Sequence, residues 1–268
     1  MTPLGAEISR SLTDQWEPFG AHHVTALVIA SVLCVNIVAY RREAARVRLD
    51  VWLVAALVAV HLAWVSTART TGLADWGDLL PLYTCDASVI LGLAWCRWKP
   101  RWLSQVLFLW AFLGGVVTLL LPDTFGYALP HIAPMYTLVF HALLLALAIE
   151  MWAVERVRPS WRGLAVTVAA SAALIPPALW ANATFGSDYM FVSRNPGGIF
   201  SWLTAFDGVP RILATIGAGS ALLAVGTLAW WAMDRALEVR EAREFAPPGP
   251  RHETAPALSA DGSRTRSG

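Results

Sequence analysis

The side chains of this sequence that could do chemistry are few, and most of them interrupt long apolar runs. Four lie within such runs and three lie at their edges: His61, Asp86, His141 and Glu150 within, and His22, His23 and His131 at the edges. An ionisable side chain in a membrane span costs roughly 3 kcal/mol or more unless it is paired or faces a cavity. These positions are therefore the first candidates for a functional site.

The densest polar stretch reads Leu-Pro-Leu-Tyr-Thr-Cys-Asp-Ala-Ser over residues 80–88. Pro81 suits the start of a helix, and Cys85 then lies about one turn deeper, roughly 6 Å along the axis. One interpretation is that Cys85 is a thiol nucleophile at the bottom of an externally open cleft. The other is that Cys85 is a small apolar filler and that Asp86 bonds to a neighbouring helix. Spacing alone favours the second interpretation.

His141 lies about ten residues into another apolar run, which places it ~15 Å deep. A histidine at that depth needs a polar partner. It can serve as the general base for Cys85, because the thiolate is the reactive form of a cysteine, or it can hydrogen-bond across helices. The residues leave both roles open. His61 comes from a run without other polar signals, and we interpret it as structural.

Neither the histidines nor the cysteines form a recognisable metal-binding pattern. The three edge histidines could reach Asp86, but the sequence has no H-x-x-x-H or H-E-x-x-H motif. Histidines at a membrane interface explain them more simply. Cys34, Cys85 and Cys96 all fall in apolar runs, so we predict no disulfide framework and no C-x-x-C site. We expect no metal and no cofactor.

The elements that must position these side chains are membrane helices. Apolar residues make up 56% of the 268-residue chain and charged residues only 15%, whereas soluble domains carry about 25% charged residues. This composition excludes a water-soluble enzyme core and a disordered chain. The formal net charge of +1 argues against a nucleic-acid binder, which needs a concentrated basic face. The expected partners are membrane lipids, and the oligomeric state is left open.

Apolar runs separated by polar residues predict an all-α membrane protein with seven transmembrane helices of roughly 20 residues each. The predicted spans are His22–Tyr40, Val51–Thr67, Leu79–Cys96, Leu103–Leu121, Pro134–Val154, Gly163–Trp180 and Pro210–Met233. Pro176 and Pro177 should kink the sixth span or end it early. The expected organisation is a short external segment (1–21), a transmembrane domain (22–233) and a largely disordered polar tail (234–268).

Basic residues concentrate in alternate loops. The loops after spans one, three and five contain Arg41, Arg42, Arg46 and Arg48, then Arg97, Lys99 and Arg101, then Arg156, Arg158 and Arg162. Positively charged loops stay cytoplasmic, so we predict an external N-terminus and a cytoplasmic C-terminus in a multi-pass protein of the cell membrane. Lys99, the single lysine, lies in a loop. A retinal pigment, which needs a lysine in its last span, is thereby excluded.

Four segments together resemble one family. They are Phe19-Gly20-Ala21-His22-His23, the Leu-Pro-Leu-Tyr-Thr-Cys-Asp block at 80–86, His141, and Asp-Tyr-Met-Phe-Val-Ser-Arg-Asn-Pro at 188–196. In this order and spacing they resemble the bacterial YwaF-like integral membrane proteins, a group related to the eukaryotic transmembrane protein 164 family. The resemblance runs over most of residues 15–235. It implies a seven-helix protein and, by the eukaryotic relatives, an acyltransferase that uses a cysteine thioester.

By position, the resemblance makes Cys85 the acyl-accepting nucleophile and His141 its base. The predicted supporting residues are Tyr83, Asp86, His23, Asp188 and Arg194. Tyr83, Thr84 and a backbone N–H freed by Pro81 are candidate oxyanion donors. Arg194 in an external loop is a candidate ligand for a lipid phosphate. The sequence thus predicts an acyltransferase or acyl hydrolase that acts on phospholipids at the outer leaflet. A non-catalytic transporter or ligand-binding protein, with Asp86, His141 and the outer histidines along a path, is the alternative.

Overall fold

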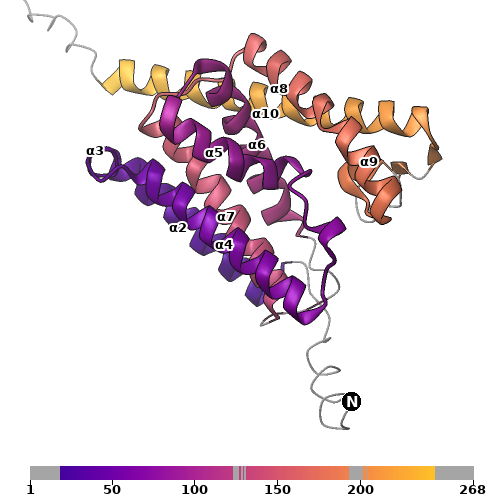
Figure 1. Cartoon of the computed structure of the whole chain (residues 1–268). Helices are drawn as coiled ribbons and strands as arrows, with labels where there is room; N and C mark the ends of the chain where they lie inside the picture. The colour runs from indigo at the N-terminus through magenta and orange to yellow at the C-terminus, as the bar shows by residue number, and fades with distance from the viewer. Residues whose placement is uncertain are drawn as a thin grey trace, which may run out of the picture. The chain divides into compact units, whose positions relative to one another are not determined.

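The computed structural model describes residues 19–122, 127, 129, 131–192, 202–203 and 205–244. Within these ranges the secondary structure is helical and contains no strand, which confirms the all-α prediction. The helices are α2 (Ala21–Ala39), α3 (Arg41–Arg46), α4 (Leu49–Thr71), η1 (Trp76–Asp78), α5 (Thr84–Trp98), α6 (Arg101–Leu120), α7 (Ile132–Ala153), α8 (Trp161–Ala173), α9 (Ile175–Phe185), η2 (Tyr189–Phe191) and α10 (Val209–Glu244) (Figure 1).

Six helical segments in the described residues are long and apolar enough to cross a membrane. They are α2, α4, α6, α7, the α8–α9 pair and the first 24 residues of α10. The third predicted span differs, because its helix α5 has only 15 residues. At 1.5 Å per residue, such a helix is about 22 Å long and falls short of the ~30 Å hydrocarbon core.

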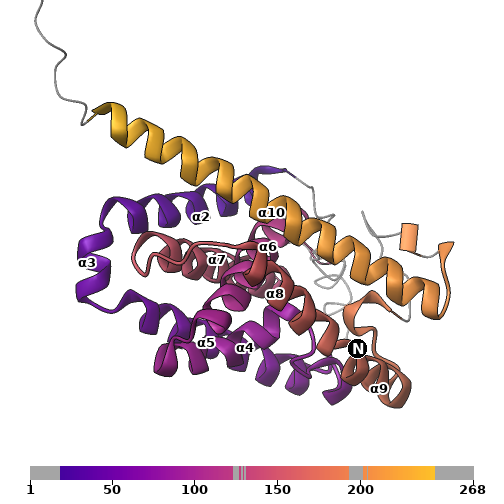
Figure 2. The ribbon, with the colours of Figure 1, turned by 90° about the horizontal axis from the view of Figure 1, so that it is seen from above.

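Helices α6 and α7 form the centre of the bundle. Half of the most apolar stretch of each is buried inside the protein, against 17–22% in the other four segments. α7 lies between α2 and α4 (Figure 2), while α6 packs against α5, α7 and α8. The core between them is built from large side chains such as Phe108, Phe140 and Trp230. The outer helices expose apolar residues, as expected for a surface in contact with lipid.

The arginine-rich loops meet at one end of the bundle. Lys99, which follows α5, places its Nζ 2.9 Å from the Asp50 Oδ2 at the start of α4, and it also pairs with Glu155 just after α7. The Gln105 side chain of α6 donates to the Arg158 carbonyl at 2.8 Å. The loops that the sequence groups together by charge therefore lie together in space.

The predicted break in the sixth span is confirmed. α8 ends at Ala173, and α9 begins at Ile175, directly before the two prolines. The last span also continues as helix into polar sequence, because α10 runs to Glu244. Residues from Trp231 onward form a separate unit. Within it, the Arg235 guanidinium lies over the Trp231 ring, 4.8 Å from the centroid.

Candidate active site

A large cavity lies at the end of the bundle where α4 ends and α5 begins. Its volume is about 1250 Å³, and its walls come from α4 to α10. Most of the lining is apolar. The exceptions include the candidate chemical groups, which are His61, Tyr83, Cys85, Asp86, Tyr136, His141 and Asp188. Five of the seven site residues predicted from the sequence therefore share one cavity.

Cys85 is the second residue of α5. The prediction that it lies a full turn into the helix is wrong, because the helix begins only after Tyr83, whose backbone is extended. Pro81 lies in the bent segment before it, in which the Leu82 amide donates to the Leu80 carbonyl at 2.8 Å.

Two adjacent glycines of α6 make room for Cys85 and for the backbone of His141. A Cβ atom on Gly114 would lie 2.6 Å from the Cys85 sulfur. A Cβ atom on Gly115 would lie 3.0 Å from the His141 carbonyl oxygen and 2.8 Å from the Leu145 Cβ. The missing side chains thus let α5 and α7 approach α6 closely at the level of the two candidate catalytic residues.

The hydrogen bond of His141 fixes its tautomer. Its Nδ1 lies 2.7 Å from the Thr137 carbonyl, one turn earlier in α7. A carbonyl oxygen only accepts, so Nδ1 carries the proton in the neutral ring and Nε2 carries the lone pair. That arrangement is the one a general base needs. Nε2 makes no hydrogen bond within the part of the chain that the structure describes.

Asp86 belongs to a polar network that joins three helices. Its carboxyl group accepts a hydrogen bond from the Tyr136 hydroxyl, and its Oδ1 lies 3.8 Å from the His61 Nδ1. The His61 Nδ1 is 3.1 Å from the Tyr136 hydroxyl oxygen. Because a phenol has one proton, donation to Asp86 leaves its oxygen to accept from the His61 ring.

The segment around η2 is tied to the start of α5. The Tyr83 hydroxyl donates to the Asp188 carbonyl at 3.0 Å, and the Leu80 amide donates to the Tyr189 hydroxyl at 2.7 Å. Asn182 of α9 binds the backbone of Tyr189: the Asn182 side-chain oxygen accepts a hydrogen bond from the Tyr189 amide at 2.7 Å. The hydrogen bond between Tyr83 and Asp188 therefore holds the start of α5 against the η2 segment at the cavity wall.

Two predicted site residues are not among those that line the cavity in the described part of the chain. His23 is buried and is not among the residues that line the cavity. Its Nδ1 accepts from the Phe19 amide at 2.9 Å, and its Nε2 donates to the Leu119 carbonyl at 2.6 Å, so it joins α2 to α6. Arg194 lies outside the described residues. Among the edge histidines, His131 caps α7 by accepting from the Ala133 amide at 3.2 Å.

Sequence reasoning missed Tyr136 and Gly114. A signal for Tyr136 existed, because it is a hydroxyl-bearing residue in a largely apolar run and must find a partner when buried. His61, which we interpreted as structural because its own apolar run carries no other polar signal, lies with its ring beside Asp86 and Tyr136. Gly114 has no such signal, because only the approach of α5 distinguishes it from the other glycines of the helices.

The fold and the cavity define a multi-pass helical membrane protein that holds a thiol, an imidazole and a carboxyl group in one largely apolar chamber. Comparison with protein families identifies the family within this class. The model of the TMEM164 family matches residues 18–235, and the chain belongs to this family. Comparisons with curated proteins and with solved structures give no match.

Proposed function

We propose that this protein transfers or hydrolyses acyl chains of membrane phospholipids through a thioester on Cys85. The observation that carries the proposal is the shared cavity, in which Cys85 at the N-terminus of α5 and His141 of α7 line the same apolar walls. Its volume of about 1250 Å³ exceeds the ~300–1,000 Å³ usual for small-molecule pockets. A chamber of this size and polarity suits a lipid acyl chain.

The chemistry follows from the groups in the cavity. His141 Nε2 removes the thiol proton, and the Cys85 sulfur attacks the ester carbonyl of a phospholipid. The carbon–oxygen bond of the ester breaks, and the lysophospholipid oxygen leaves with the proton from His141. An acceptor hydroxyl, or water in a hydrolase, then attacks the thioester while His141 takes its proton, and the thiol is restored.

Helix α5 also supplies donors for the oxyanion of this reaction. Its first intrahelical hydrogen bond runs from the Ala87 amide to the Tyr83 carbonyl at 2.9 Å. The amides of Thr84, Cys85 and Asp86 precede that bond and have no intrahelical acceptor. Backbone amides at a helix start stabilise a developing negative charge. They are better candidates than the Tyr83 hydroxyl, whose proton is already donated to Asp188.

We further propose that the chain crosses the cell membrane seven times, with its N-terminus outside and the cavity open to the outer leaflet. Lys99 at the end of α5 meets Asp50 at the start of α4, which supports α5 as the return crossing. The non-helical stretch before α5 lines the cavity through Leu79 and Tyr83. Irregular backbone at membrane depth is tolerated where it lines a cavity. The positive-inside rule places the arginine-rich end in the cytoplasm.

Reconstitution with a labelled phospholipid tests the proposal. Wild type should release labelled lysolipid and form a hydroxylamine-sensitive acyl adduct on Cys85. Cys85→Ser should lower turnover at least about 10³-fold, and His141→Ala about 10²–10⁴-fold. Cys34→Ser and Cys96→Ser are matched controls, because both are partly buried cysteines that do not line the cavity.

If Cys85→Ser keeps full turnover and no adduct forms, the nucleophile assignment fails. Saturable lipid binding without turnover in wild type would instead favour the ligand-binding or transport function, in which Asp86 and His141 line a path through the cavity.

A further inference from the structure

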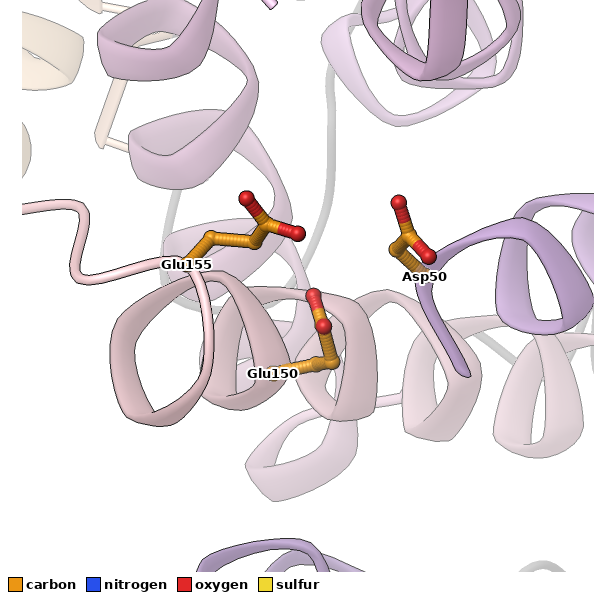
Figure 3. Close-up of side chains that lie close together, drawn as sticks. All are labelled: Asp50, Glu150 and Glu155. Atoms are coloured by element: carbon orange, nitrogen blue, oxygen red, sulfur yellow. The ribbon is translucent and has the colours of Figure 1, made fainter. Parts of the chain in front are cut away.

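Three carboxyl groups converge at the arginine-rich end of the bundle, away from the cavity. Asp50 lies in the first turn of α4, Glu150 in the last turn of α7, and Glu155 just after α7. One oxygen from each lies within 4.8 Å of the others. Their carboxyl groups point toward one another (Figure 3). None of the three lines the cavity, so this cluster is separate from the candidate active site.

Within the described residues, two cations pair with the three carboxyl groups of the cluster. Lys99 pairs with Asp50 and Glu155, and the exposed Arg48 lies 3.6 Å from Asp50. Among the described residues, neither Lys99 nor an arginine forms an ion pair with Glu150. It is 1% exposed, and its Oε2 makes no hydrogen bond to any residue that the structure describes. A buried carboxylate without a partner is strongly unfavourable, so either a proton or a bound cation must neutralise Glu150.

We propose that Asp50, Glu150 and Glu155 bind a divalent metal ion with the preference of Ca²⁺. Carboxylate oxygens are the ligands of hard cations. Ca²⁺ takes oxygens at about 2.3–2.6 Å, so oxygens on opposite sides of the ion lie roughly 4.6–5.2 Å apart, against about 4.0–4.2 Å for Mg²⁺. Oxygens that all lie within 4.8 Å of one another can share one ion, and the flexible geometry of Ca²⁺ accepts such a set more readily than the near-ideal octahedron that Mg²⁺ demands.

Lys99 is a competitor for this ion. Its ammonium group contacts two of the three carboxylates, so an ion bound by all three must displace it. The side chain can leave, because it is 32% exposed and has a flexible four-carbon stem. Ion binding therefore replaces the Lys99 ammonium group by a divalent ion. The bound ion would link the start of α4 to the end of α7.

Equilibrium binding to the full-length protein in lipid nanodiscs tests the site, with Ca²⁺ or Mg²⁺ added alone. Wild type should bind one Ca²⁺ saturably and bind Mg²⁺ more weakly. Glu150→Gln should weaken Ca²⁺ binding at least about tenfold, since even the loss of an outer partner of a metal ligand costs about 10–100-fold. Lys99→Met should strengthen it, because the competing ammonium is gone. Asp75→Asn is the matched control, because Asp75 pairs with Arg69 on the surface.

A second measurement uses the single lysine of the chain. Amine modification at Lys99, read by peptide mass spectrometry, should increase when Ca²⁺ displaces the ammonium group. The proposal is overturned if neither wild type nor Lys99→Met binds Ca²⁺ saturably, or if Ca²⁺ leaves Lys99 modification unchanged. It is also overturned if Glu150→Gln binds Ca²⁺ as wild type does, because the Glu150 carboxylate would then contribute nothing to Ca²⁺ binding. None of these readouts depends on acyl transfer.

Discussion

Replacing Gly114 by alanine is the sharpest test of how α6 positions the candidate nucleophile. The added Cβ would lie 2.6 Å from the Cys85 sulfur, far closer than the normal contact distance of about 3.5–4.0 Å. Either the sulfur rotates away from its present position or α5 and α6 separate. Both changes move the thiol relative to His141, so the variant should lose activity as well as stability.

The expected magnitude follows from two opposing effects. Overpacking of a buried site costs about 1–3 kcal/mol, and alanine in place of a helical glycine returns roughly 0.5–1 kcal/mol. In the Cys85→Ala background the sulfur is absent, so only the second effect remains and Gly114→Ala should stabilise. The coupling between the two sites should thus be about 1–3 kcal/mol. At about 2–4 °C per kcal/mol, this is roughly 2–12 °C in Tm.

Thermal unfolding of the four proteins of this double-mutant cycle, followed by tryptophan fluorescence in detergent, measures the coupling. Gly217→Ala in α10 is the control, because a Cβ atom there would have no neighbour within 4 Å; it should leave stability unchanged or raise it slightly. Additivity of the Gly114 and Cys85 substitutions within about 0.5 kcal/mol would refute the contact and with it the positioning role of Gly114.

Three further predictions concern residues around the site and the cluster. Tyr189→Phe removes the acceptor of the Leu80 amide and should lower the free energy of unfolding by about 1–3 kcal/mol, whereas Tyr40→Phe at an exposed position should change it by under about 0.5 kcal/mol; equal effects in thermal unfolding would show that the Tyr189 hydroxyl does not stabilise the segment before α5. Tyr136→Phe removes the hydroxyl that bonds Asp86 and His61 and should lower phospholipid turnover while leaving expression intact; unchanged turnover would exclude the network from the reaction. Burial alone lowers the pKa of Lys99, but its hydrogen bonds to Glu155 and Asp50 raise it overall. The Lys99 contribution to stability is therefore present below the unfolded pKa of about 10.4 and is lost as the pH rises through the folded value; Lys99→Arg, which stays charged, should show a smaller alkaline fall in Tm.

The sequence by itself determined the class of protein and most of its helices. Apolar runs long enough to cross a bilayer specify helices because a backbone in lipid must satisfy its own hydrogen bonds. α2, α4, α6 and α7 accordingly begin and end within a few residues of the predicted spans. The tandem prolines determined the break between α8 and α9 for an equally local reason, the loss of backbone donors.

The start of α5 was not determined in this way. Hydropathy continues through Leu79–Tyr83, so the sequence placed these residues inside a span. In the structure the helix begins only at Thr84, because the preceding segment is held by Tyr83 and Tyr189 contacts to distant residues. That difference moved Cys85 from one turn inside the helix to its first turn.

Only the tertiary structure decided which polar residues meet. The sequence marked Asp86, His141 and Glu150 as costly in lipid, since burial of an ionisable group is a local inference from the apolar run around it. Asp86 and Glu150 meet residues on distant segments of the chain, at His61 and Tyr136 for Asp86 and at Asp50 for Glu150. Such pairings depend on which helices pack and how closely they approach, and contacts such as Gly114 against Cys85 arise only when the bundle has formed.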